Sequence, residues 1–590
     1  MGLIFSDLAK KIILLCLGVF LFLLFFHRGI ETEDVWLHLS TGQWIVHHGQ
    51  LPYNDKFPFA QENTPYLCHE WLASSLLYLT FKTVGFTGLK LFRSIFFILS
   101  IGIFFIYAYR RLPFSLLVFL TVLMAYALFQ RCLLRPDSVN LIFVQVFLIS
   151  LFSYERNGGR WKLFLLPLIG IFWYNLHMMG AFIYGGSIIF VFLISALIRR
   201  AAVKGLALTF VVFLILFILN PYGVDGLLFP YKVILFPKYY GFYKMVNITA
   251  ELQNSAYIFL SFDYFYYILL MIIPFVFLSQ SKKLDPTLNL LFTIALFAFL
   301  YMTRNSSFFT LVAVYTIVHA AGNIDFLSQW ARARWSAWLD TSLLLGVTFF
   351  LIIQSFNFLN ETVYSNGSKQ RVLYLETNPY VTSTFDFLNE NKILGPVFNG
   401  TLLGGPMIWF DYPQLRPFDD GRHLDYQRYS DETNVLLNPI DNWGKTQEKY
   451  GFKIVILSEG FNLEENVINY LHAQKDWQLI AIKGPIVIFV KKGEFHLSNE
   501  LDTFERRLGA VVLTKMETNQ LRMMVSGKSR SMLEKFLNPD PLMVDTFPQG
   551  VTLMNLSYKG AAAKCFMEAL KISDQDYIHE TVNIFLKQLN

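Results

Sequence analysis

The chain has 590 residues, of which 54% are hydrophobic and only 16% are charged. Soluble domains carry about 25% charged residues, so this composition excludes a wholly soluble protein. The net charge of +6 is small for this length and does not indicate a nucleic-acid-binding protein. The four cysteines have no Cys-x-x-Cys spacing, so they indicate neither a zinc ribbon nor a disulfide framework.

Apolar runs recur from Ile12 to Phe358, and most are about 17–22 residues long, which is enough to cross hydrocarbon as helices. No small-residue cleavage pattern follows the first run, so we interpret it as a retained helix rather than a signal peptide. The shorter amphipathic stretch 70–81 predicts an interfacial helix lying along the membrane. The sequence thus predicts a polytopic α-helical membrane domain over residues 1–358. Its expected spans, about eleven, are 12–27, 91–109, 113–130, 138–154, 162–177, 181–198, 205–220, 264–280, 287–303, 306–322 and 338–358.

Short basic clusters indicate the orientation of these spans. If Lys10 and Lys11 are cytoplasmic, the alternating direction of the spans places all the remaining basic connections on the cytoplasmic side as well, as the positive-inside rule requires. The outer face then receives the loops 28–90 and 221–263 and the whole C-terminal part. We therefore predict a multi-pass protein of the bacterial inner membrane with a periplasmic C-terminal domain. The other basic connections are Arg110/Arg111, Arg156/Arg160/Lys162, Arg199/Arg200/Lys204, Lys282/Lys283 and Arg332/Arg334.

Polar residues gather at the span ends on the predicted outer face. Ionisable groups at membrane depth are costly and usually mark a substrate path or a functional pocket. Simpler interpretations stay open, because Asp34 follows Thr32 as acids do at a helix N-terminus, and Arg135 fits an interfacial anchor. Asp34 and His38 share a helix face, which suits a functional pair or an ordinary hydrogen bond. The set comprises Asp34, His38, His69, Glu70, Arg135, Asp137, Asn175, His177, Asn220, Glu251, Arg304 and Asn305.

Together these residues predict a site for an anionic lipid. The guanidinium forks of Arg135 and Arg304 match phosphate oxygens in a bidentate way. A carboxylate such as Asp34 beside them could act as a general base on an acceptor hydroxyl or amide. The residues that we expect to line this substrate pocket are His38, His69, Glu70, Asp137, Asn175, His177 and Glu251.

The sequence stretches that carry these polar residues, taken in their order along the chain, resemble those of the GT-C superfamily, integral-membrane glycosyltransferases that use polyprenyl-phosphate-linked sugars. The stretch EDVWLHLSTGQWIVHHGQLPYNDKFPF, with HEWLA after it, is similar to the first outer loop of a group of bacterial GT-C-type proteins. LRPD, NLHMMG, NPYG, AELQ and RNSSFF resemble later blocks of that group, and so do residues 397–426. The resemblance covers residues 1 to about 490.

This resemblance implies an inverting sugar transfer with an outer-loop Asp as the general base. Carried over to this sequence, that residue is Asp34, or Glu33 if the motif is offset by one. Many superfamily members have a tighter acidic pair followed by a basic residue. Here VWLH follows, and His38 is the candidate for the basic role.

Residues 359–499 predict a soluble α/β domain. KIVILSEG (453–460) and PIVIFVKKG (485–493) are strand-like apolar runs bounded by Gly. TLLGGPMIWF (401–410) and FDDGRHLDY (418–426) predict polar-aromatic loops. In the second loop, Asp419, Asp420 and Arg422 are candidates to bind an acceptor or to fold over the membrane site, although DDGR also suits a simple turn.

Residues 500–590 predict a helical tail. The stretch 557–573 has Gly and Ala at close helix-packing spacing and resembles one tetratricopeptide repeat, a module for protein contacts. A solenoid needs about three repeats. The tail therefore either recruits a protein partner or packs on its own domain.

The sequence as a whole predicts a membrane glycosyltransferase that moves a sugar from a polyprenyl-phosphate donor to a lipid, glycan or protein acceptor. A divalent metal is compatible with this function but not required, because the sequence shows no dense carboxylate cluster. Two alternatives stay open. One is a non-catalytic membrane assembly or scaffold protein, and the other is a transporter or flippase of lipid-linked sugars.

Overall fold

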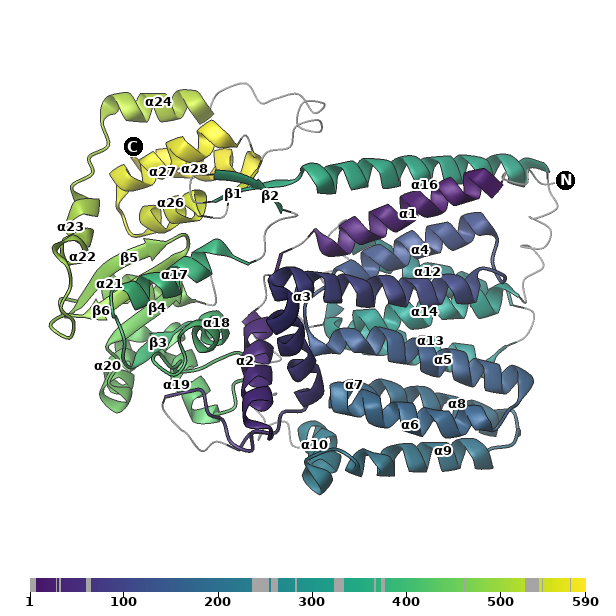
Figure 1. The fold of residues 1–590 in the computed structure, drawn as a ribbon. Coiled ribbons are helices and arrows are strands. Elements are labelled where there is room, and N and C mark those ends of the chain that lie inside the picture. The colour runs from purple at the N-terminus through teal and green to yellow at the C-terminus, as the bar shows by residue number, and fades with distance from the viewer. Residues whose placement is uncertain are drawn as a thin grey trace. The chain divides into compact units, whose positions relative to one another are not determined.

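The computed structural model describes residues 7–27, 29–30, 33–59, 65–235, 254–255, 264–281, 284–322, 334–365, 368–372, 377–459, 463–525, 541–543, 545–573 and 575–589. The fold divides into two compact units (Figure 1). The first unit comprises Met1–Phe26, Thr41–Leu51 and Leu67–Ser355. The second unit comprises His27–Ser40, Pro52–Tyr66 and Phe356–Asn590, so it takes two pieces of the long loop 28–90 together with the C-terminal part.

The first unit is a bundle of apolar helices that lie roughly parallel to one another (Figure 1). Each of the eleven apolar runs predicted from the sequence coincides with a helix. Many large apolar side chains point outward, with Ile106 78% exposed and Phe297 70% exposed, as expected of surfaces that face lipid. The helices are α1 (Asp7–Phe26), α3 (Trp71–Ala108), α4 (Phe114–Phe129), α5 (Asn140–Asn157), α6 (Trp161–Leu176), α7 (Met178–Gly180), α8 (Gly186–Ile198), α9 (Lys204–Ile215), α10 (Gly223–Leu235), α12 (Phe265–Ser279), α13 (Pro286–Tyr301) and α14 (Ser306–Ala321).

Shorter turns and two helices that both units share complete the bundle. Three 3-10 turns precede or follow its helices, and a π-helical turn joins α7 to α8. Helices α2 and α16 each run from one unit into the other. The bounds of these elements are η1 (Pro136–Val139), η2 (Ala181–Gly185), η3 (Leu216–Ile218), η7 (Thr303–Asn305), α2 (Glu33–His48) and α16 (Arg334–Asn360).

Length and hydropathy identify the protein as a multi-pass membrane protein. Five described helices are long and apolar enough to span a bilayer, and a sixth is gained if α9–η3 and α10, which meet at a bend of 116°, form one broken span. Four apolar helices are shorter than a full span, namely α4, α6, α12 and α13. The number of eleven spans therefore stays a prediction.

Element α3 consists of two helical segments that meet at a kink. The sequence predicted a helix at 70–81 and a separate span at 91–109, and these two stretches lie on opposite sides of the break. The interfacial placement of the first helix stays a prediction. The helix is interrupted at Gly85, whose φ of 67° lies in the left-handed region that favours glycine. The kink thus divides the element close to where the sequence pattern changes, although the helix continues on both sides of it.

The second unit contains a four-stranded sheet in the order β3-β4-β6-β5. Strands β3 and β4 are parallel, and the other two pairings are antiparallel. The predicted runs 453–460 and 485–493 become β4 and β6, so the strand predictions for them are confirmed. The strands are β3 (Val397–Asn399), β4 (Ile454–Ser458), β5 (Trp477–Lys483) and β6 (Ile486–Lys491).

Both faces of this sheet are buried, which explains why its strands read as continuous apolar runs. Ile454 and Ile456 of β4 belong to one hydrophobic core, whereas Val455 and Leu457 belong to the other. A smaller sheet, in the order β2-β1-β7, was not predicted. The remaining elements of the unit's first part are β1 (Thr362–Ser365), β2 (Ser368–Arg371), α17 (Pro379–Glu390), α18 (Thr401–Asp411), α19 (Tyr426–Leu437), α20 (Pro439–Tyr450) and α21 (Glu464–His472).

The prediction of a loop at 401–410 is wrong, because this stretch forms helix α18. Two glycines and Pro406 lower its intrinsic helix propensity, but packing overrides that preference. Leu403 and Met407, four residues apart, are both buried in the core. Gly404 lets the backbone of Asp419 approach, since a Cβ at position 404 would collide with the Asp419 carbonyl oxygen. The loop predicted at 418–426 is confirmed up to Asp425, after which α19 begins.

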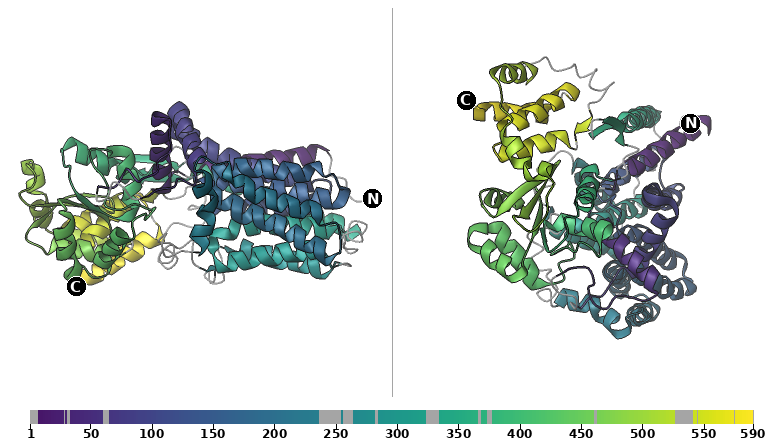
Figure 2. Two further views of the ribbon diagram at one scale, coloured as in Figure 1. Left: turned by 90° about the horizontal axis from the view of Figure 1, so that it is seen from below. Right: turned by 60° about the vertical axis from the view of Figure 1, so that its left-hand side comes forward.

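The tail is helical, as predicted, and packs on its own unit. Phe566 and Ala562 of α27 share one hydrophobic core with Leu479 of β5 and Leu457 of β4. In Figure 2 the yellow tail helices lie beside the green sheet. These contacts favour the alternative in which the tail completes its own domain, and recruitment of a partner stays a prediction. The tail contains α22 (Asn499–Asp502), α23 (Phe504–Gly509), α24 (Lys515–Val525), β7 (Leu542–Met543), α26 (Thr546–Asn555), α27 (Lys559–Ile572) and α28 (Asp576–Leu589).

We expect Phe566→Ala to destabilise the second unit, because Phe566 is fully buried in the core that joins the tail to the sheet. Truncation of a buried Phe costs about 3–5 kcal/mol of unfolding free energy. A fluorescence-monitored melt of the full chain in detergent measures the effect as a fall in Tm. The control is Ile584→Ala on α28, where the side chain is 53% exposed. Equal Tm values for the two variants would contradict a shared core.

Candidate functional site

Three of the polar motifs predicted at the span ends, HEWLA, NLHMMG and NPYG, come together in the first unit. The backbone N–H of Met178 donates to the His69 carbonyl oxygen at 3.3 Å. The indole Nε1 of Trp71 donates to Asn175 Oδ1 at 3.1 Å, and Asn175 Nδ2 reaches the Leu219 carbonyl oxygen at 3.5 Å. The HEWLA, NLHMMG and NPYG motifs therefore lie side by side, although 150 residues separate the first from the last.

Glu70 and His177 form a polar pair within this cluster. His177 Nε2 lies 3.1 Å from Glu70 Oε1, and the two side chains are only 6% and 12% exposed. His177 Nδ1 accepts a hydrogen bond from the backbone N–H of Gly180 at 2.8 Å. Because Nδ1 acts as an acceptor, a neutral ring must carry its proton on Nε2, which then donates to Glu70. His69 lies farther from the carboxylate, at 3.8 Å, and stacks on Phe229.

The position of His177 depends on a close contact between α5 and the α7 turn. A Cβ at position 180 would collide with the side chain of Asn140, so only glycine fits there. Asn140 is itself held by Trp173, whose Nε1 donates to Asn140 Oδ1 at 2.7 Å. This contact presents the Gly180 N–H to His177 and fixes the orientation of the ring.

A small pocket with two arginines lies close to this cluster. Arg131 pairs with Asp137 at 2.9 Å, and Arg304, Arg135 and His177 all act electrostatically on the Asp137 carboxylate. The side chain of Tyr184 donates to Asn305 Oδ1 at 3.0 Å beside it. The pocket is lined by Phe97, Arg131, Asp137, Ser138, Asn140, Leu141, Val144, Tyr184, Arg304, Ser307, Phe308 and Leu311.

The chemistry of this pocket suits an anionic group attached to an apolar chain. Arg131 and Arg304 supply two guanidinium groups against the single carboxylate of Asp137, and hydroxyl groups add further donors. Phe97, Leu141 and other apolar side chains form the rest of the lining. An alkyl phosphate combines the same two chemistries.

Arg304 and Asp137, which the sequence analysis assigned to the outer-face site, both line this pocket, and so do Arg131 and Tyr184, which it did not single out. Arg135, which was expected to hold the phosphate, acts on Asp137 electrostatically, while Arg131 makes the ion pair and lines the pocket. A signal for Arg131 was present, because it follows the apolar run 113–130 directly, at the predicted outer end. Tyr184 lies inside an apolar run, and nothing in the sequence marked it.

The predicted base lies in the second unit, on the first turns of α2. Asp34 and His38 are half-buried, and the helix is anchored by Trp36, whose ring centroid lies 5.0 Å from that of Phe410. Glu33 begins the helix. Glu251 lies outside the described residues. The roles of all these residues in catalysis or substrate binding stay predictions.

Asp420 and Arg422 take part in a buried ion cluster of the second unit. Arg422 NH2 lies 2.6 Å from Asp420 Oδ2 and 3.0 Å from Asp55 Oδ1, and its guanidinium stacks over Tyr66 and Phe57. Burial alone would raise the pKa of Asp420, but Arg422 holds it below its usual value. The cluster ties the segment Pro52–Tyr66 to the DDGR loop, and binding of an acceptor by Asp420 and Arg422 stays a prediction.

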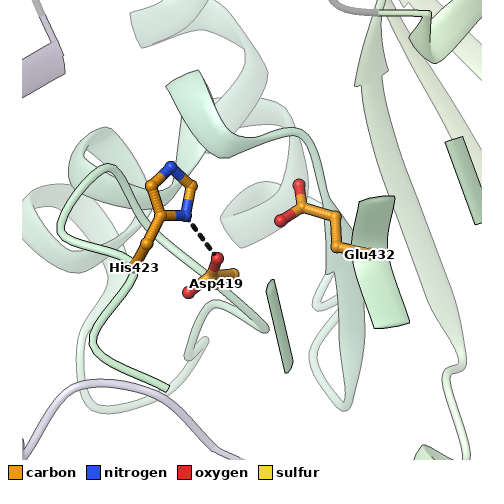
Figure 3. Close-up of side chains that lie close together, drawn as sticks. All are labelled: Asp419, His423 and Glu432. Atoms are coloured by element: carbon orange, nitrogen blue, oxygen red, sulfur yellow. Dashed lines mark hydrogen bonds and ion pairs between the residues drawn. The ribbon is translucent and has the colours of Figure 1, made fainter. Parts of the chain in front are cut away.

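A second polar group lies on the same loop and was missed from the sequence, which showed no dense carboxylate cluster. Asp419, His423 and Glu432 each offer one ligand atom, and these atoms lie within 4.8 Å of one another. His423 Nδ1 is 2.7 Å from Asp419 Oδ2 (Figure 3). The ligand-type spacing became visible only when the loop folded back on α19.

No protein-family model matches the sequence, and no curated protein matches it either. Solved structures do match. The apo oligosaccharyltransferase of Archaeoglobus fulgidus superposes with a TM-score of 0.56 at 11% identity, covering 93% of this chain and 86% of that one. The archaeal oligosaccharyltransferase AglB from Archaeoglobus fulgidus, solved with an inhibitory peptide and a dolichol-phosphate, gives 0.56 at 11% identity and covers 96% and 87%. The oligosaccharyltransferase complex with Zn and sulfate gives 0.51 at 12% identity and covers 76% and 68%.

The first two likenesses extend over nearly the whole chain and show that it shares the fold of these oligosaccharyltransferases. At 11–12% identity they show a common architecture. The substrate and the reaction of this chain must be argued from its own residues.

We expect Arg422→Met to destabilise the second unit by about 3–5 kcal/mol, because it removes the guanidinium that two buried carboxylates contact directly. The matched control is Arg507→Met, which removes an exposed ion pair with Glu500 and should cost about 0–1 kcal/mol. Thermal melts of both purified variants measure the difference. A Tm for Arg422→Met within error of the control would show that the buried cluster contributes no stability.

The buried carboxyl of Asp411 should make stability depend on pH. Burial raises its pKa from 3.8 to about 6, despite a hydrogen bond from Asn389. The folded state therefore binds the proton more tightly, and its stability falls as pH rises from about 4 to about 6. We expect Asp411→Asn to remove this loss of stability. The Tm of the variant minus that of the wild type should therefore increase as the pH rises from about 4 to about 6. Asp476→Asn, which changes an exposed carboxyl, should run parallel to the wild type. A parallel Asp411→Asn curve would contradict the assignment.

Proposed function

We propose that this protein is a membrane glycosyltransferase that moves a sugar from a polyprenyl-phosphate donor to an acceptor. The observation that carries the proposal is the pocket in which Arg131 and Arg304 face an apolar wall at the polar end of the bundle. The fold supports it, since the archaeal oligosaccharyltransferase of the same architecture was solved with a dolichol-phosphate.

The two arginines suit the donor phosphate in both the bound and the departing state. Guanidinium forks bind phosphate oxygens in a bidentate way. Charge accumulates on those oxygens as the bond between the sugar and the phosphate breaks, so preorganised cations stabilise the transition state more than the ground state. The Glu70–His177 pair supplies further hydrogen-bonding groups at the same end of the bundle.

We assign the role of general base to Asp34, on the GT-C resemblance of its motif. In an inverting transfer, the acceptor oxygen or nitrogen attacks the anomeric carbon while the carbon–oxygen bond to the phosphate breaks. The phosphate leaves with the bonding electrons, and the acceptor's proton passes to the base. Glu33 is the alternative base, and His38, one turn after Asp34, is the candidate for the basic residue of the motif.

The basic connections support an outer-face site. Under the positive-inside rule, the cluster formed by His69, Glu70, Asp137, His177 and Arg304 faces the periplasm of a bacterial inner membrane. A donor in the outer leaflet and a periplasmic acceptor follow from this orientation.

A transporter or flippase is less well supported. Such a protein needs polar groups along its path through the membrane. The described bundle does contain such groups. His319 shares a hydrogen bond with the Tyr107 hydroxyl at 2.7 Å. The Gln145 amide donates to Ser100 and Leu141, and its Oε1 accepts from Tyr315 at 3.1 Å. A side chain so fully bonded to its neighbours is typical of a structural network. A non-catalytic scaffold predicts that the polar cluster is dispensable, and the following experiment tests this.

Sugar transfer by the purified chain, measured with a panel of polyprenyl-phosphate sugars, tests the proposal. We expect Asp34→Asn to lower the rate at least about 100-fold, as loss of a general base does, with little change in KM for the donor. We expect Arg131→Gln and Arg304→Gln to lower kcat/KM as well. The matched control is Arg110→Gln, which changes an exposed arginine on the predicted cytoplasmic side.

The outcomes separate the alternatives. Full activity of Asp34→Asn would transfer the role of base to Glu33. Full activity of both pocket variants would remove the phosphate assignment. Two results together would favour the scaffold. The purified wild-type protein would transfer no sugar from any donor, and the Asp34→Asn variant would still complement a deletion of the gene in cells.

A further inference from the structure

The group formed by Asp419, His423 and Glu432 has the chemistry of a metal site outside the proposed transfer site. Asp419 and His423 lie on the loop between α18 and α19, and Glu432 lies on α19 itself. Figure 3 shows the Glu432 carboxylate directed toward the other two side chains. Asp419 and Glu432 are only 1% and 2% exposed. Two carboxylates and an imidazole are therefore gathered away from water.

Glu432 provides an independent sign that a ligand is expected. Its Oε1 accepts a hydrogen bond from Thr401 Oγ1 at 2.9 Å. Its Oε2 is buried and has no hydrogen-bond donor among the residues that the structure describes. A buried carboxylate oxygen without a partner is costly. The Asp419 carboxyl lies within hydrogen-bonding reach of Glu432, so two acids face each other without a donor group between them in the described segments, and the charges of Asp419 and Glu464 both oppose ionisation of Glu432.

The neighbouring cations do not solve this problem. Arg422 is engaged by Asp420 and Asp55, and Arg428 donates to the Phe418 carbonyl oxygen and lies 4.0 Å from Asp425. Within the described part of the chain, the ion pair of Asp419 is with His423, whose ring is positive only when protonated. A divalent cation between the three ligand atoms would satisfy the Glu432 oxygen and compensate both carboxylates.

We propose that Asp419, His423 and Glu432 bind a divalent transition-metal ion of the zinc and manganese class. Oxygen and imidazole ligands without thiolate suit these ions. The metal would join the DDGRH loop to α19 and so hold in place the loop that also carries the Asp420–Arg422–Asp55 cluster. His423 Nδ1 now shares a hydrogen bond with Asp419, so binding through this nitrogen displaces a proton. This proposal does not rest on the proposed sugar transfer.

The test uses the untagged full chain in detergent, stripped with EDTA and then dialysed against zinc or manganese alone. We expect metal analysis to give one zinc or manganese fewer per chain for His423→Ala and Glu432→Gln than for the wild type. The control variants change exposed residues of the same unit, His496→Ala and Glu448→Gln, and should keep the wild-type stoichiometry. A wild type that binds neither ion, or variants that keep the full stoichiometry, would overturn the proposal.

A second measurement on the wild type keeps the test valid if either variant fails to fold. X-ray absorption at the zinc edge should show only oxygen and nitrogen ligands at about 2.0–2.2 Å, with the scattering pattern of an imidazole. Zinc should also raise the Tm of the stripped protein, because a ligand that binds only the folded state stabilises it. A sulfur shell, or a Tm unchanged by saturating zinc and manganese, would overturn the proposal.

Discussion

Hydrocarbon offers no hydrogen bonds, and the first unit is organised around that constraint. Every polar group placed at membrane depth must find a partner inside the protein. Gln145 does so by bonding to three neighbouring residues, and the remaining functional groups are placed at the helix ends. His69, Glu70, His177 and the arginine pocket therefore gather at one end of the helices, where polar groups are less costly than inside the hydrocarbon. A site for a lipid phosphate at the helix ends needs no deep aqueous channel.

The same constraint explains which features could be predicted from the sequence. An apolar run between polar ends can be recognised from neighbouring residues alone, so all eleven runs were predicted to be helices. The polar motifs at their outer ends were also recognised, and alternation of the spans predicted that they meet. Contacts between Met178 and His69 or between Trp71 and Asn175 show that they do.

Features that depend on tertiary packing could not be predicted. Helix α18 contains residues with low helix propensity and forms because Leu403 and Met407 enter a core. One of the two carboxylate partners of Arg422 is Asp55, which lies 367 residues away, and no local pattern indicates such a pairing. The ligand-type group of Asp419, His423 and Glu432 was missed for a similar reason. The first two are close in sequence, but Glu432 approaches only because α19 folds back beside the loop.

The division of the chain between its two units has a consequence for how the protein can be made and dissected. The chain passes from one unit to the other five times, after residues 26, 40, 51, 66 and 355. Phe59 packs against the second unit's core, and Arg416 donates to the carbonyl oxygens of Lys56 and Phe57. The C-terminal 235 residues therefore do not form the complete second unit. Its other two segments, His27–Ser40 and Pro52–Tyr66, are synthesised first, and nearly 290 residues of the first unit follow them before the C-terminal part is made. This unit therefore cannot be completed before its last segment is synthesised, and a soluble fragment cut at residue 355 would lack part of its own interior.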